Sequence, residues 1–305
     1  MKATFMYLAA GAVLLIGLIT IFRRGFAARG LDAIVEFGPL FFAIPMAVFG
    51  TFHFLFTASV AALVPHWIPG HMFWAYFVGV ALIAAAVSLA TRKLSTLAAT
   101  LLGVMLLSFV LLISVPGVAA HPENRFGWAL LLRDLSFSSA AFALAISRRW
   151  IGTEGAYRYL WAVLRSAIAI AMIFFAVEHF RHPEFVPVIP LPQPLPPWFP
   201  LQALVNYVVG CALLVAGVCL LLNMRSRSVA SLIGTAVLVV VILVYLPLLI
   251  ATPSDVAQVN YFFDTLAYAG SLLLLASLAA KQTRLTNTQA NGEFGGSERL
   301  IERYK

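Results

Sequence analysis

The sequence contains few charged residues, and this shortage decides its class. Only 10% of its 305 residues are Asp, Glu, Lys or Arg, whereas 62% are hydrophobic and the mean hydropathy is +0.96. Soluble globular chains carry roughly 25% charged residues. Apolar runs of about 20 residues, enough to cross a ~30 Å hydrocarbon core, recur along almost the whole length. The composition excludes a soluble globular protein and predicts an all-α polytopic membrane protein.

Cysteine is also scarce, since only Cys211 and Cys219 occur. A spacing of eight residues puts them about 12 Å apart along a helix, too far for a disulfide. This spacing argues against thiol redox chemistry. The sequence also lacks a nucleotide-binding motif, an extended catalytic triad and a haem-attachment motif. The net charge of +8 does not indicate nucleic acid, because the basic residues lie in short loops between apolar runs.

We predict nine membrane spans. They cover residues 4–22, 36–60, 72–91, 95–116, 126–147, 158–181, 202–223, 229–250 and 259–280. Alternate loops are basic, for example Arg23–Arg24 after the first span and Arg92–Lys93 after the third. The positive-inside rule then places the N-terminus outside and the C-terminus in the cytoplasm. The expected location is the inner (plasma) membrane of the cell.

The sequence contains an internal repeat at an offset of about 131 residues. Such a repeat fixes the architecture, so it is interpreted before individual residues. The repeated positions include Trp67, Tyr76, Gly79 and Pro116, which recur as Trp198, Tyr207, Gly210 and Pro247. We predict an N-terminal helix (1–30), two four-helix units (31–150 and 151–280) and a mobile cytoplasmic tail (281–305). An even number of spans per unit makes the repeat parallel, which disfavours a transporter built on inverted repeats.

The longest loop, residues 182–200, is rich in proline but otherwise apolar. Proline predicts an extended conformation without helix or ladder pairing. The loop is expected to lie in the outer interface or to fold over the helix ends. Trp67 and Trp198 fit interfacial anchors. An anchored loop and a lid over a site both remain open at this point.

A resemblance rests on the residues around this loop. Glu178-His179-Phe180, the proline-rich stretch ending Trp198-Phe199-Pro200, and a span with Tyr207 and Gly210 resemble the DoxX-like family. The first half, with His53-Phe54, looks like a diverged second copy, so the resemblance covers about 250 residues. It implies a four-helix membrane unit, and some family members resemble quinone-linked oxidoreductase subunits. Related folds use cysteine pairs that this chain lacks.

Polar residues within spans are candidates for function because they are costly there. We expect two outer clusters, one per half. The first contains His53, Tyr76 and Asp134, and the second contains Glu178, His179, Asn206, Tyr207 and Asp264, with Trp198 nearby. Such groups either tie helices together or handle a proton at a quinone or other apolar ligand. We expect the second cluster to be the better site, with His179, Asp264 and Glu178 as catalytic candidates and the others as ligand-binding residues.

Other polar residues are expected to be structural. Glu36 lies near the depth of Arg165 and is predicted to pair with it. Arg133 is predicted to point away from its neighbour Asp134, toward a headgroup or a loop carboxylate. No metal site is assigned. Haem is disfavoured, although His53 and His179 would be its only symmetric pair of ligands.

The sequence therefore predicts a DoxX-like integral membrane protein that binds a quinone or similar apolar molecule in or beside a redox process. The alternative is a non-catalytic accessory or assembly subunit of a larger membrane complex. Whether the chain is an enzyme stays open. Its expected partners are membrane lipid, the quinone, and either a membrane-protein partner or a second copy of itself, but not nucleic acid.

Overall fold

The structure, a computed structural model, describes residues 1–149, 152–197 and 199–303, with side chains as far as Gln282. Within these residues the chain is helical and has no strand, which confirms the all-α class. Nine helical segments there are long and apolar enough to span a membrane, so this is a multi-pass membrane protein. They are Lys2–Arg23, Leu31–Leu55, His71–Thr91, Ser95–Ala120, Arg125–Arg148, Glu154–Arg181, Gln202–Leu221, Ser226–Ala251 and Val256–Gln282.

Several of these spans are divided into shorter helices. The elements before residue 150 are α1 (Lys2–Arg23), α2 (Leu31–Glu36), α3 (Gly38–Leu55), α4 (Thr57–Ala61), α5 (His71–Thr91), α6 (Ser95–Phe109), the π-helix η1 (Val110–Ser114), α7 (Val115–Ala120) and α8 (Arg125–Arg148). Those after it are α9 (Glu154–Arg181), α10 (Gln202–Leu221), α11 (Ser226–Val240), the π-helix η2 (Val241–Tyr245), α12 (Leu246–Ala251) and α13 (Val256–Arg303).

The second span differs most from its prediction. It begins at Leu31 rather than 36, is interrupted at Phe37, and ends at Leu55 rather than 60. Pro39 has no N–H to donate to the carbonyl of Val35, four residues earlier, which explains the interruption. At the other end of the chain, the backbone of α13 is helical through Arg303. The mobility and cytoplasmic location of residues 281–305 stay predictions.

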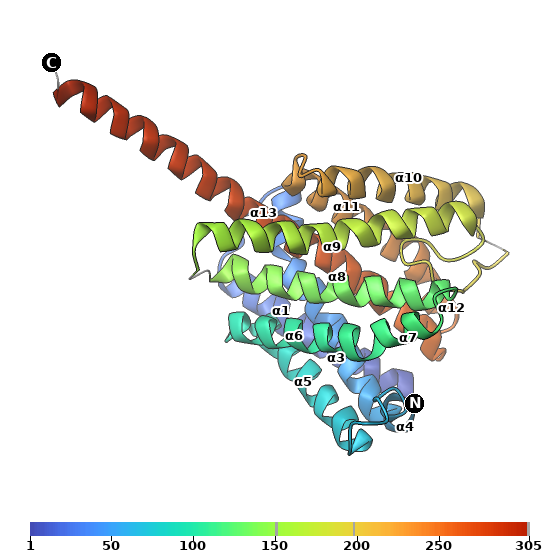
Figure 1. Cartoon of the computed structure of the whole chain (residues 1–305). Coiled ribbons are helices and arrows are strands. Elements are labelled where there is room, and N and C mark those ends of the chain that lie inside the picture. The colour runs from blue at the N-terminus through green and yellow to red at the C-terminus, as the bar shows by residue number, and fades with distance from the viewer. Residues whose placement is uncertain (150–151, 198, 304–305) are drawn as a thin grey trace.

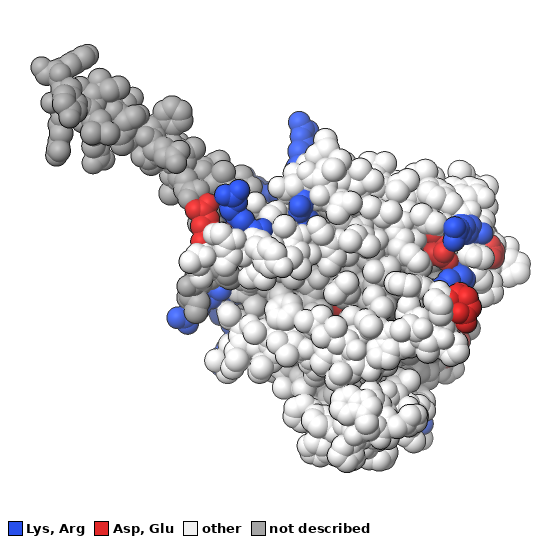
Figure 2. Space-filling model, in the orientation of Figure 1, with Lys and Arg blue, Asp and Glu red and all other residues white. Residues whose placement is uncertain are grey.

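Charged side chains gather at the two ends of the bundle. Figure 2 shows Lys, Arg, Asp and Glu at both ends and a broad uncharged belt between them. Such a belt is what a lipid-facing surface requires, because a charge at the bilayer centre costs at least about 2.5 kcal/mol. The proline-rich loop lies at one end, drawn in yellow in Figure 1. We call this end the loop end.

The two halves share their local backbone. The π-helices η1 and η2 occupy equivalent places, 131 positions apart, and each is followed by a proline-containing helix. The turn after α5 holds Arg92 and Leu94 in the left-handed conformation, and the turn after α10 does the same with Asn223 and Arg225. The offset found in the sequence thus appears again in the conformation of the chain.

The helices pack as a closed ring. Along the chain α3 packs on α5, α5 on α6 and α6 on α8; likewise α9 packs on α10, α10 on α11 and α11 on α13. The two halves also pack against each other. Helix α8 packs on α9, α13 packs on α3, and α8 and α13 contact each other between the halves. This order is two-fold symmetric, and α1 is added on α3 and α5. Figure 1 shows α13 running behind α8 and α9.

The predicted pair of Glu36 and Arg165 does not form. Glu36 accepts a hydrogen bond from Arg92, the residue that follows α5. Arg165 instead donates to the carbonyl groups of Leu220 and Leu221. These carbonyls lie at the end of α10, where the regular helical N–H donors stop, although the backbone N–H of Asn223 also donates to Leu220. Arg165 therefore completes a helix end.

Candidate functional site

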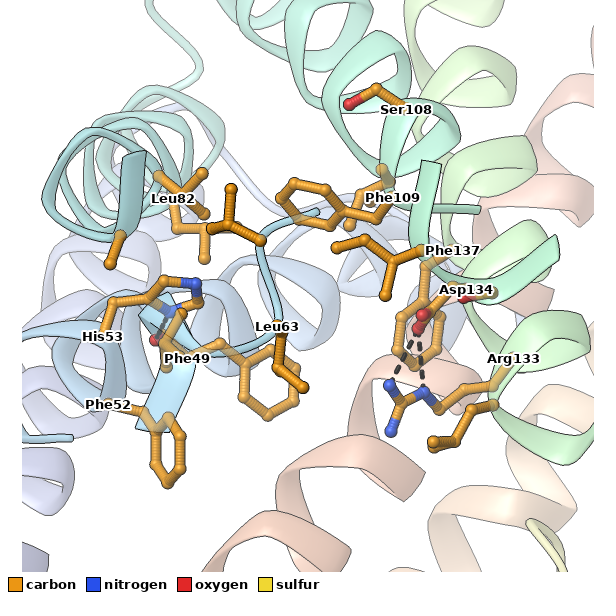
Figure 3. A pocket seen from close by; sticks show the side chains of 18 of the residues that line it. Phe49, Phe52, His53, Leu63, Leu82, Ser108, Phe109, Arg133, Asp134 and Phe137 are labelled. Atoms are coloured by element: carbon orange, nitrogen blue, oxygen red, sulfur yellow. Dashed lines mark hydrogen bonds and ion pairs between the residues drawn. The ribbon is translucent and has the colours of Figure 1, made fainter. Parts of the chain in front are cut away.

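A cavity of about 610 Å³ lies within the first half, near the loop end. Side chains from α3, α5, α6, η1, α8 and α13 enclose it. Most of them are apolar, including Phe49, Leu82, Phe109 and Phe137 (Figure 3). One wall, α13, belongs to the second half of the chain and is present because α13 packs on α3 and α8. The cavity thus depends on the exchange of contacts between the halves.

His53 supplies a polar group on one side of this cavity. Its Nδ1 lies 2.7 Å from the carbonyl oxygen of Phe49, one turn earlier in α3. Because a carbonyl only accepts, Nδ1 carries the proton and donates. The other nitrogen, Nε2, points toward the apolar side chains of the cavity in Figure 3. In the neutral ring this nitrogen is a hydrogen-bond acceptor.

The opposite side holds an ion-pair cluster, which we call the Arg133 triad (Arg133, Asp134 and Asp264). The Arg133 Nε donates to Asp134 at 2.9 Å, and a terminal nitrogen donates to Asp264 at 2.8 Å. The three side chains are only 19%, 17% and 8% exposed. The prediction for Arg133 was wrong, because its long side chain bends back to its neighbour and reaches across to α13. The triad carries two carboxylates for one guanidinium, and it joins the halves.

The cavity reaches the surface through apolar side chains. Leu63, Trp74, Leu112 and Phe126 line it and are themselves exposed. Trp74 belongs to α5 and Leu112 to η1, both parts of membrane-spanning segments. An apolar rim on the membrane-facing side suits a ligand that arrives from lipid. The described lining therefore combines an apolar entrance with two separate polar groups.

The second predicted cluster is not assembled. Asp264 lines the first-half cavity, paired with Arg133, and does not join His179. Glu178 lies 2.7 Å from Arg125 of α8. His179 and Asn206 are fully buried against the proline-rich loop, to which both are hydrogen-bonded. The grouping failed because α13 turns this carboxylate toward α8 rather than toward α9.

Three predicted ligand-binding residues lie elsewhere. Tyr76 and Tyr207 are 45% and 43% exposed and pack outward against Phe54 and Phe180. Their hydroxyl groups are therefore away from the cavity. Trp198 lies outside the described residues. Of the eight predicted site residues that the structure describes, His53, Asp134 and Asp264 line the cavity.

The proline-rich loop enters the protein interior. Val186, Val188 and Ile189 are fully buried. The described part of the loop contains no helix and no β-ladder; Phe185 and Pro194 form one isolated antiparallel bridge. Two backbone hydrogen bonds flank this bridge. The Val186 N–H donates to the carbonyl of Gln193, and the Leu195 N–H donates to the carbonyl of Glu184. Val188 has φ of +77°, a strained conformation for a β-branched residue, held in place by its burial.

Sequence reasoning missed three contributors to the cavity from the second half. Leu191, from the loop of the second half, lines the cavity of the first half. Asn260 and Tyr261 of α13 also line it, one turn before Asp264. Only their position near Asp264 in the sequence offered a signal. Among the described residues, no group of three or more His, Cys, Asp or Glu side chains is placed to hold a metal ion.

Comparison of the chain with models of protein families, with curated proteins and with solved structures found no match.

Proposed function

We propose that the chain is a tandem DoxX-like membrane protein that binds a lipophilic small molecule of the quinone class in its first-half cavity. The observation that carries this proposal is the cavity itself. Its volume of about 610 Å³ lies in the range of ligand pockets, roughly 300–1,000 Å³. An apolar lining with a few placed polar groups is the usual character of such sites.

The entrance favours a ligand that partitions into the membrane. A quinone combines an apolar body with polar groups on opposite edges of a ring, and His53 and the Arg133 triad lie on opposite sides of the cavity (Figure 3). The redox role follows from the resemblance, and the electron carrier would belong to a partner chain. We place the protein in the inner (plasma) membrane with its N-terminus outside, from the distribution of basic loops.

The test is to fill the cavity. Ala75 lines it and is buried, so Ala75→Phe puts a ring into the ligand volume. Val80 is exposed on the same helix, α5, so Val80→Phe is a matched control. Each protein is purified in mild detergent, and its bound lipids are extracted and identified by mass spectrometry. We expect near-stoichiometric quinone with the unmodified chain and Val80→Phe, and at least a tenfold loss with Ala75→Phe.

Two results would overturn the proposal. One is equal quinone in all three proteins, which would place the quinone elsewhere. The other is quinone-free protein that purifies only in a stable complex with other membrane chains. That second result would favour the accessory-subunit alternative.

A further inference from the structure

The counterpart of the cavity in the second half is filled by the chain itself. Among the residues there that hydrogen-bond the proline-rich loop are His179, Asn206 and Tyr245. By the offsets of the repeat they correspond to His53, Ala75 and Ser114. All three of these line the first-half cavity. The loop therefore occupies in the second half the space that is open in the first half. Its contacts show which chemical groups the lining of this space can bind.

The side chains of the second half bind the carbonyl oxygens of the loop. His179 Nε2 donates to the carbonyl of Val188 at 3.3 Å. Asn206 Nδ2 donates to the carbonyl of Phe185 at 2.7 Å, and Tyr245 Oη donates to that of Pro187 at 2.5 Å. Each contact runs from a side-chain donor to a backbone acceptor. The filled site is thus a set of donors arranged around carbonyl groups.

The first half differs at all three positions. Ala75 has no polar group, and Ser114 is much shorter than Tyr245. His53 has turned its N–H to its own backbone, at Phe49.

The Arg133 triad lies on the opposite side of the cavity. Each guanidinium nitrogen of Arg133 contacts a carboxylate oxygen of Asp134 or Asp264, and each terminal nitrogen keeps a second N–H. Donors therefore remain on the α13 side, where Asn260 and Tyr261 also line the cavity. On the His53 side the group that faces a ligand is the lone pair of Nε2, which is an acceptor.

We infer that the first-half cavity selects a ligand bearing a hydroxyl group, a hydroquinone or related phenol, over the corresponding carbonyl compound. The hydroxyl donates to His53 Nε2. A quinone oxygen at the same place sets lone pair against lone pair and leaves a buried acceptor unpaired, which is costly. The inference rests on the proposed function and adds which form of the ligand is held. No electron transfer is required for this selection.

The experiment compares three probes of one shape on the purified full chain. They are a decyl-substituted benzohydroquinone, the benzoquinone made from it, and its dimethyl ether, which keeps the oxygens but has no hydroxyl. Dissociation constants are measured anaerobically in detergent by equilibrium dialysis. We expect the hydroquinone to bind at least about tenfold more tightly than either of the others.

Variants then locate the effect. His53→Phe should bring the three dissociation constants within about threefold of one another, because the acceptor is gone. His53→Gln, which can donate as well as accept, should restore binding of the quinone. Tyr207→Phe, a hydroxyl removed outside the cavity, should leave all three constants unchanged.

The outcomes separate the two proposals. Equal binding of all three probes to the unmodified chain, or tighter binding of the quinone, overturns the selection for hydroxyl but leaves the proposed function in place. If none of the three probes binds, the proposed function itself is overturned. A preference for hydroquinone that survives His53→Phe assigns the selection to another group and overturns the role of His53.

Discussion

The two halves of this protein have the same backbone and different interiors. Both contain a π-helix, a left-handed turn and a close helix contact at equivalent glycines, Gly79 and Gly210. In the second half a longer loop enters the bundle and fills it. In the first half the connection is shorter and a cavity remains. The comparison teaches that loop length and three side chains decide whether this scaffold holds its own chain or a ligand.

Breaking the link between the halves should have the largest effect. Arg133→Leu leaves Asp134 and Asp264 buried without their cation. Removing one partner from a buried ion pair costs about 3–5 kcal/mol, and we expect that loss in the free energy of unfolding. Thermal unfolding in detergent measures it. Adding Asp134→Asn and Asp264→Asn should recover part of the stability; a single variant within ~1 kcal/mol of the parent would contradict the structural role of the triad.

The glycine contacts offer a sharper comparison, because the same substitution can be made in each half. A Cβ at Gly79 would lie 2.9 Å from the ring of Phe54, and one at Gly210 would lie 3.1 Å from the ring of Phe180. Overpacking of this kind costs about 1–3 kcal/mol. We expect both Gly→Ala variants to lower the unfolding temperature, Gly79→Ala more than Gly210→Ala. A larger decrease for Gly210→Ala would show that the first half rearranges more easily around its cavity than the second half does.

A third pair tests what holds the loop. Tyr245→Phe removes the hydrogen bond to Pro187, a loss of about 1 kcal/mol, and should speed proteolysis between residues 185 and 195. Its counterpart Ser114→Ala should change the free energy of unfolding by less than about 0.5 kcal/mol. Limited proteolysis with mass spectrometry of the fragments distinguishes them. Unchanged cleavage in Tyr245→Phe would mean that burial of the loop side chains alone keeps it in place.

The smallest effects are expected at the outward tyrosines. Tyr76→Phe and Tyr207→Phe remove hydroxyl groups from half-exposed side chains, and surface changes of this kind stay within about ±0.5 kcal/mol. Ligand binding should also be unchanged. A loss of bound ligand in Tyr76→Phe would place that side chain at the site after all.

The sequence predicted the spans and the repeat well, because apolar runs and duplicated glycines, prolines and tryptophans are local signals. It also placed His53, Asp134 and Asp264 among the site residues. It could not show that Asp264 belongs with His53 rather than with His179, since that depends on how the halves exchange helices. The entry of the loop was hidden for a similar reason. Its prolines predicted an extended chain, but the space it enters is made by α9, α10 and η2 together.

The closed ring also has a consequence for how the chain is made. The helix α3 completes its packing only against α13, and a Cβ at Gly270 of α13 would lie 2.7 Å from the backbone of Phe42 in α3. About 200 residues separate the two helices, which at ~5–20 residues per second take about 10–40 s to synthesise. During that interval one face of α3 has no protein neighbour. The ribosome must therefore deliver the last span before the first half can acquire the final wall of its cavity.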